Sequence, residues 1–135
     1  MAFKFNEKRR LRTPDNSTFK FGRRNIPIKK VDMEDGTLAE ANMDGSVSVD
    51  KDLDLNSTLG ERVIKHEDEH RRQMGFDDDG EKTLTPKAAY DDVSVTWKGR
   101  KYPRKNGKVF YRTKWYNEGS DALPWEKEAI AAENK

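Results

Sequence analysis

The sequence has 135 residues, of which 33% are hydrophobic and 39% are charged, and its formal net charge is +2. This length supports one domain with a small core, and the absence of cysteine excludes disulfides, cysteine-ligated metals and a thiol nucleophile. No apolar run approaches transmembrane length and the N-terminus has no apolar signal core, so we expect a cytoplasmic protein with no membrane partner.

The first 30 residues carry ten Lys or Arg against two acidic residues, a net charge of +8. We therefore divide the chain into a basic N-terminal arm, residues 1–30, and a domain, residues 31–135. Within the arm, residues 18–21 could form a short strand. Basic residues interleaved with Phe suit contacts with nucleic acid, and equally suit an acidic surface in a larger protein assembly. The candidate partner-binding side chains are Arg9, Arg10, Arg12, Arg23 and Arg24.

Residues 37–50 are predicted to form a β-hairpin. Asp44-Gly45 lies between two segments of alternating character, which is a strong signal for a tight turn between antiparallel strands.

Residues 58–74 are predicted to form a helix. Thr58, with Glu61 three residues later, is typical of a capping box, and Gly75 is typical of the position just past a helix end. Spacings of three and four residues define an inward-facing stripe of Leu59, Val63, His66, His70 and Met74. The charged residues that we expect to face solvent are Asp68, Glu69, Arg71 and Arg72.

This helix contains the motif His-Glu-x-x-His, formed by His66, Glu67 and His70. Two histidines four apart on a helix lie on one face, one turn apart, where both can bind a single tetrahedral Zn²⁺. A Glu directly after the first His can take a proton from a metal-activated water, so Glu67 is the candidate general base. The alternative is a pair of core-facing histidines on a charged helix.

Alternating apolar residues predict a strand over residues 93–97, and Asn106-Gly107 predicts a turn before a strand over residues 108–116. A short helical turn is expected near residues 86–90. The C-terminal segment is predicted to be a helix that begins at Pro124.

A third metal ligand is expected on the C-terminal helix. Trp125, Glu128, Ala129 and Ala132 share one face, and a glutamate on a Trp/Ala face indicates that its charge is needed there. Glu128 is therefore the predicted ligand, and Glu126 on the neighbouring face is the alternative. An ordinary amphipathic helix with Glu128 at its border is also compatible with this pattern.

The chain resembles the gluzincin branch of the zinc metallopeptidases, whose members combine an HExxH helix with a downstream glutamate ligand. The matching residues are His66-Glu67-Asp68-Glu69-His70 and Glu128-Ala129, and the general style is that of minimal single-domain peptidases of phage and bacterial families. The resemblance covers residues 37–133. It implies an α+β, zincin-like domain with a β-hairpin, the HExxH helix, a second β-hairpin and a C-terminal ligand helix.

The resemblance also implies a function. His66, His70 and Glu128 would bind Zn²⁺, Glu67 would be the general base, and the hairpin at residues 37–50 would pair with an extended peptide or protein substrate. Tyr111 or Tyr116 would stabilise the oxyanion.

Two other interpretations remain open. One is a structural or assembly protein, virion-associated in a phage particle, with a non-catalytic metal site and a basic arm. The other is a nucleic-acid-binding module without a metal, which would bind through residues 1–30.

Overall fold

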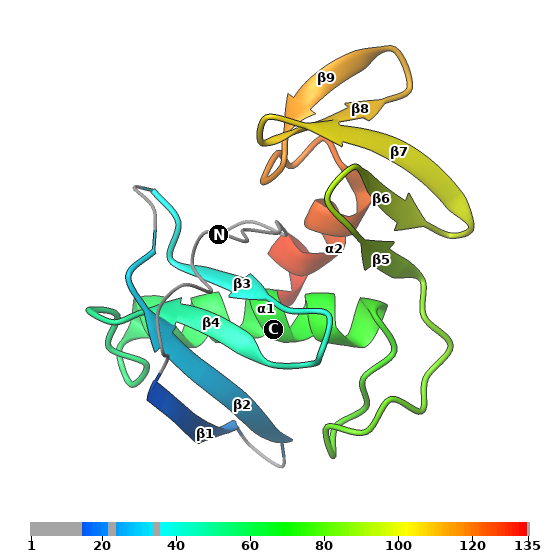
Figure 1. The fold of residues 1–135 in the computed structure, drawn as a ribbon. Helices are drawn as coiled ribbons and strands as arrows, with labels where there is room; N and C mark the ends of the chain where they lie inside the picture. Colours follow the sequence, from blue (N-terminus) through cyan, green and yellow to red (C-terminus); the bar gives the residue numbers. More distant parts are fainter. Residues whose placement is uncertain (1–14, 22–23, 34–35, 135) are drawn as a thin grey trace.

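The computed structural model describes residues 15–21, 24–33 and 36–134, which form a mixed α+β fold with two sheets and two helices (Figure 1). The first group of elements is β1 (Asp15–Phe21), β2 (Arg24–Val31), β3 (Ala39–Ala41), β4 (Val47–Asp50) and α1 (Thr58–Gln73). The second group is β5 (Ala88–Tyr90), β6 (Ser94–Trp97), β7 (Arg100–Lys105), β8 (Lys108–Tyr111), β9 (Lys114–Asn117) and α2 (Pro124–Ala132).

The first sheet has the strand order β1-β2-β4-β3, with β2 parallel to β4 and the other neighbours antiparallel. The predicted hairpin is confirmed as β3 and β4, joined through Asp44-Gly45, where Gly45 has a φ of 89°. A Cβ at Gly45 would lie 2.6 Å from the Phe76 ring, so the turn requires glycine for space as well as for conformation. This hairpin leaves β3 at the edge of the sheet.

Two strands of the first sheet come from the segment that we assigned to the basic arm. β1 includes the short strand expected at residues 18–21, and the boundary drawn at residue 30 falls inside β2. Ile26 and Ile28 alternate along β2 and are at most 1% exposed, so this strand contributes to the core despite its basic neighbours. Of the predicted partner-binding arginines, Arg24 is the first residue of β2, and the others (Arg9, Arg10, Arg12 and Arg23) lie outside the described residues.

α1 packs against the first sheet, with Val63 and Ile64 in a core cluster that includes Val47 and Val49. The helix begins at Thr58 as predicted, but its N-cap is Ser57 and not Thr58, because the Ser57 hydroxyl accepts the amide of Gly60 at 3.0 Å. The predicted end is confirmed, since Gly75 follows the helix with a φ of 103°. On the predicted inward stripe Val63, His66, His70 and Met74 are buried, but Leu59 in the first turn is 46% exposed.

The expectation that Asp68 and Arg71 face solvent is wrong, because both side chains are 1% exposed. Arg71 Nη1 donates to Asp68 Oδ1 at 2.7 Å, and its Nε donates to the carbonyl oxygen of Gly45 at 2.6 Å. The guanidinium thus connects α1 to the β3–β4 turn. α1 is covered on two sides, by the first sheet and by α2, which is why charged residues are buried on it.

The second sheet is an antiparallel meander in the order β5-β6-β7-β8-β9. Two predictions differ from it. Residues 88–90 form β5, where we expected a helical turn, because they pair with β6. The single strand predicted over residues 108–116 is divided into β8 and β9 by a turn at Arg112, whose φ is 61°.

The position of α2 is set by its second residue, Trp125. Trp125 is 0% exposed and packs in an aromatic cluster with Trp97, Tyr102 and Tyr111 of the second sheet. The opposite side of α2 contacts α1. The second sheet therefore determines where α2 presents its polar side chains. In the described part of the chain, neither helix is long and apolar enough to cross a membrane.

The buried Arg71 should contribute far more to stability than its neighbour Arg72. Arg71→Gln removes the guanidinium from the buried Asp68 carboxylate and the Gly45 carbonyl, and we expect a loss of about 3–5 kcal/mol in the free energy of unfolding. Arg72 pairs with Asp78 at the surface, so Arg72→Gln should cost at most about 1 kcal/mol. Urea denaturation followed by tryptophan fluorescence measures both, and equal losses would contradict the structural role of Arg71.

Candidate metal centre

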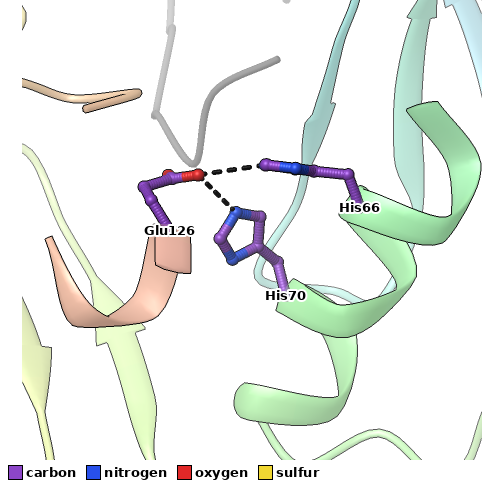
Figure 2. A group of neighbouring side chains, drawn as sticks. All are labelled: His66, His70 and Glu126. Carbon is purple, nitrogen blue, oxygen red and sulfur yellow. Dashed lines mark hydrogen bonds and ion pairs between the residues drawn. The ribbon is translucent and has the colours of Figure 1, made fainter. Parts of the chain in front are cut away.

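Three side chains from two helices converge at one point between α1 and α2. Figure 2 shows His66 and His70 of α1 directed toward Glu126 of α2. Glu126 Oε1 lies 3.0 Å from Nε2 of His66 and 3.2 Å from Nε2 of His70. All three residues are at most 1% exposed, and one ligand atom from each lies within 4.8 Å of the others. This spacing fits a single metal ion bound to two imidazole nitrogens and one carboxylate oxygen.

The helix face of α2 explains why Glu126 occupies this position and the predicted ligand Glu128 does not. The apolar stripe of α2 consists of Trp125, Ala129 and Ala132, and at helical spacing Glu126 and Glu128 lie on opposite borders of it. Because the stripe is rotated with its Glu126 border toward α1, Glu126 is 0% exposed. Glu128 is instead 35% exposed. Its Oε1 accepts from Lys87 Nζ at 2.9 Å and from Gln73 Nε2 at 3.3 Å.

The second nitrogen of His66 is held by a carboxylate that our sequence prediction missed. His66 Nδ1 donates to Glu133 Oε2 at 2.7 Å, and Arg62 Nη2 donates to the other Glu133 oxygen at 3.2 Å. Glu133 follows Glu126 by two helical turns, so the two glutamates share a border of α2. The i,i+7 spacing of these glutamates was the available sequence signal.

The second nitrogen of His70 is held by Gln73. The Gln73 amide nitrogen donates to the Trp125 carbonyl at 3.0 Å, which fixes the orientation of the amide group. Its oxygen therefore faces His70 Nδ1 at 2.8 Å, and that nitrogen must carry the proton. Both histidines thus use Nδ1 as a donor and turn Nε2 toward Glu126.

This arrangement has a chemical consequence. In a neutral imidazole with Nδ1 protonated, Nε2 carries a lone pair and no proton. The Nε2 atoms of His66 and His70 are then acceptors that lie 3.0 and 3.2 Å from a third acceptor, the Glu126 oxygen, which is repulsive unless a cation lies among them. Metal-binding histidines characteristically have the other ring nitrogen fixed by a carboxylate or an amide oxygen, as here. The residues present therefore fit a metal ion.

Without a metal, protons would have to supply the missing positive charge. Burial lowers the pKa of His66, but the carboxylates of Glu126, Glu67 and Glu133 outweigh this effect and raise that pKa to about 9. Burial raises the pKa of Glu126, but the charges and hydrogen bonds of His70 and His66 prevail and lower that pKa to about 2. Both pKa shifts favour a positive charge on His66 beside the carboxylate anion of Glu126.

Glu67 lies on a different face of α1 and is directed toward the edge strand. Its Oε1 accepts the backbone amide of Ala41 in β3 at 3.1 Å. Its Oε2 is buried and has no hydrogen-bond partner among the described residues. Burial raises the pKa of this carboxyl to about 7, although the positive charges of His66 and His70 act against the shift. Glu67 thus has one buried carboxylate oxygen whose hydrogen-bonding capacity the described residues do not use.

The two predicted oxyanion residues lie elsewhere in the described structure. Tyr111 on β8 and Tyr116 on β9 pack as rings in the aromatic cluster, 6.4 Å apart between centroids. A tyrosine that we did not predict, Tyr90 on β5, is nearer to Glu67. Its hydroxyl donates to the Ala41 carbonyl at 2.7 Å, so the backbone of Ala41 is bound by Glu67 at its amide and by Tyr90 at its carbonyl.

Comparisons of the chain with protein-family models, with curated protein sequences and with solved structures found no match. The functional conclusion therefore depends on the chemistry of the side chains described above.

Proposed function

We propose that the protein is a zinc-dependent metallopeptidase of gluzincin type. In this proposal His66, His70 and Glu126 bind Zn²⁺ and Glu67 is the general base. The observation that carries the proposal is the convergence of the Glu126 carboxylate with the Nε2 atoms of two buried histidines, whose Nδ1 protons are used by Glu133 and Gln73. A second buried carboxylate oxygen, on Glu67, has no hydrogen-bond partner among the described residues. Two neutral imidazoles and one carboxylate are a ligand set of catalytic zinc sites.

The number of ligands supports catalysis over a purely structural site. Structural zinc is almost always bound by four protein ligands, whereas catalytic zinc has three and an open position. The described residues supply three ligand side chains that lie close enough together. Glu67, the next carboxylate along α1, is turned to the amide of Ala41 and is not part of that group.

The residues can be assigned to the steps of peptide hydrolysis. When bound, Zn²⁺ supplies a Lewis acid that lowers the pKa of water to about 7 and polarises a carbonyl group. Glu67 Oε2 accepts a proton from the attacking water as its oxygen bonds to the peptide carbon. Glu67 then donates that proton to the amine that leaves when the C–N bond breaks. The Ala41 amide holds the other Glu67 oxygen and so keeps Oε2 directed to the reacting water.

β3 supports a substrate-binding role in this proposal. Leu38 and Asn42 hydrogen-bond with β4, so the alternate residues Ala39 and Ala41 turn their backbone groups away from the sheet. An extended peptide would pair with this edge at Ala39 by strand addition, because Glu67 and Tyr90 already bind the backbone amide and carbonyl of Ala41. The amide of Ala41 is already used by Glu67, which places the general base beside this edge.

The identity of the third ligand can be tested by zinc affinity. Glu126→Gln removes the charge at the site without changing the side-chain size, and we expect zinc affinity to fall more than about 100-fold, beyond the usual effect of altering an outer partner. Glu128→Gln is the matched control on the same helix and should bind zinc like the wild type. Calorimetric titration of chelator-treated protein measures both. A loss in Glu128→Gln with normal binding in Glu126→Gln would contradict the assignment.

The role of Glu67 can be separated from metal binding. Glu67→Gln should retain one zinc per chain and the wild-type melting temperature, but peptide cleavage should fall about 10²- to 10⁴-fold because the general base is lost. Glu69→Gln removes a carboxylate from the same helix and should remain active. Cleavage of a proteome-derived peptide mixture, followed by mass spectrometry, provides the measurement without a known substrate. Equal activity of Glu67→Gln and wild type would exclude the proposed mechanism.

The burial of the centre favours a second candidate function, a structural or assembly protein with a non-catalytic metal site. His66, His70, Glu126 and Glu67 are all at most 1% exposed, as expected for a metal that stabilises a fold. In that case zinc would raise the melting temperature strongly, the wild type would cleave no peptide in the mixture, and Glu67→Gln would behave like the wild type in every assay.

A further inference from the structure

The outward face of β7, β8 and β9 combines lysines with an exposed tryptophan and a half-buried phenylalanine. Tyr102, Val109 and Tyr116 point inward to the core cluster, so the alternate residues of the three strands point outward. We call this surface the outer β7–β9 face, formed by Lys101, Lys105, Lys108, Phe110 and Trp115. Figure 1 shows these strands at the opposite end of the molecule from β1 and β2, with α2 on their inner side.

All the charged residues of this face are positive. Residues 93–117 contain eight Lys or Arg and no Asp or Glu. Lys105 and Lys108 are both exposed and are directly opposite each other on β7 and β8. Like charges in a direct cross-strand pair are destabilising, and no ion pair between described residues involves either lysine. An anionic ligand would relieve this repulsion.

The aromatic residues on the same face form a defined pair. Phe110 and Trp115 are direct cross-strand partners, and their ring centroids are 5.3 Å apart in an edge-to-face arrangement. Trp115 is 44% exposed, whereas Trp97 and Trp125 are 6% and 0% exposed. Burial in the core therefore accounts for two of the three tryptophans and leaves Trp115 available at the surface.

We propose that the outer β7–β9 face binds single-stranded nucleic acid. The phosphates would contact Lys101, Lys105 and Lys108, and bases would stack on Trp115 and Phe110. Exposed aromatics on the face of an antiparallel sheet, flanked by basic residues, are how proteins bind unpaired strands without reading their sequence. An acidic protein would satisfy the lysines but would not explain the exposed Trp115 paired with Phe110.

This face differs from the segment that the sequence favoured for nucleic-acid binding. Our sequence-based expectation placed that function in residues 1–30, whereas the described structure assembles lysines and aromatic rings on residues 101–115. The proposal does not depend on the metal centre, so binding should be the same with and without a chelator.

Fluorescence anisotropy with labelled oligothymidine and oligouridine of about 15 nucleotides tests the proposal and compares DNA with RNA. We expect both to bind and to quench the fluorescence of exposed Trp115. Trp115→Ala should weaken binding about tenfold or more, the range for loss of one stacked base. Lys105→Gln/Lys108→Gln should reduce the slope of log affinity against log salt by about 1 to 1.5, as expected for two lost phosphate contacts.

The matched control is Lys51→Gln/Lys82→Gln, which removes the same charge from exposed lysines outside this face and should leave the salt slope unchanged. Absence of binding by the wild type would overturn the proposal. So would binding that is insensitive to Trp115→Ala and equally well competed by polyglutamate, because that result would identify a surface for acidic proteins.

Discussion

The contact of the Glu126 carboxylate with the imidazoles of His66 and His70 is the interaction on which the rest of the structure depends. A charge that is 0% exposed is costly unless opposite charge lies beside it, and His66 and His70 provide nitrogen atoms at 3.0 and 3.2 Å. This contact requires α1 and α2 to lie at a fixed rotation and distance. Trp125, the residue before Glu126, fixes that rotation by packing into the aromatic cluster of the second sheet. The second sheet therefore determines where α2 places Glu126 relative to His66 and His70.

α1 presents polar side chains on two faces because it lies between two packed layers. One face carries the histidines to α2, and their Nδ1 atoms are held by Glu133 and Gln73. The other face carries Glu67 to β3, where the Ala41 amide holds one of its oxygens. Consecutive residues His66 and Glu67 can serve different layers since successive side chains on a helix are about 100° apart. The buried Arg71 extends the second contact to the β3–β4 turn, so the edge strand and the helix are connected at two points.

The sequence predicted the parts of the fold that depend on local patterns. The HExxH helix, its end at Gly75 and the β3–β4 hairpin follow from periodicity, turn residues and motif spacing. The sequence did not show that Glu126, and not Glu128, lies beside the histidines, because both border the same apolar stripe and only the packing of α2 on α1 selects between them. The buried Arg71 and the first two strands were missed for a related reason. Charged sequence surroundings indicate exposure, whereas Ile26 and Ile28 are enough to bring β2 into the core.

We propose above that His66, His70 and Glu126 bind one metal ion. A crystal structure of the zinc-loaded protein, with anomalous diffraction recorded at the zinc absorption edge, tests it most directly. We expect one strong anomalous peak between α1 and α2, about 2.0–2.2 Å from Nε2 of both histidines and from a Glu126 oxygen. No peak at this point, with His66 and His70 still in contact with Glu126 in zinc-saturated crystals, would contradict the account. The histidines would then be core residues held by buried ion pairs.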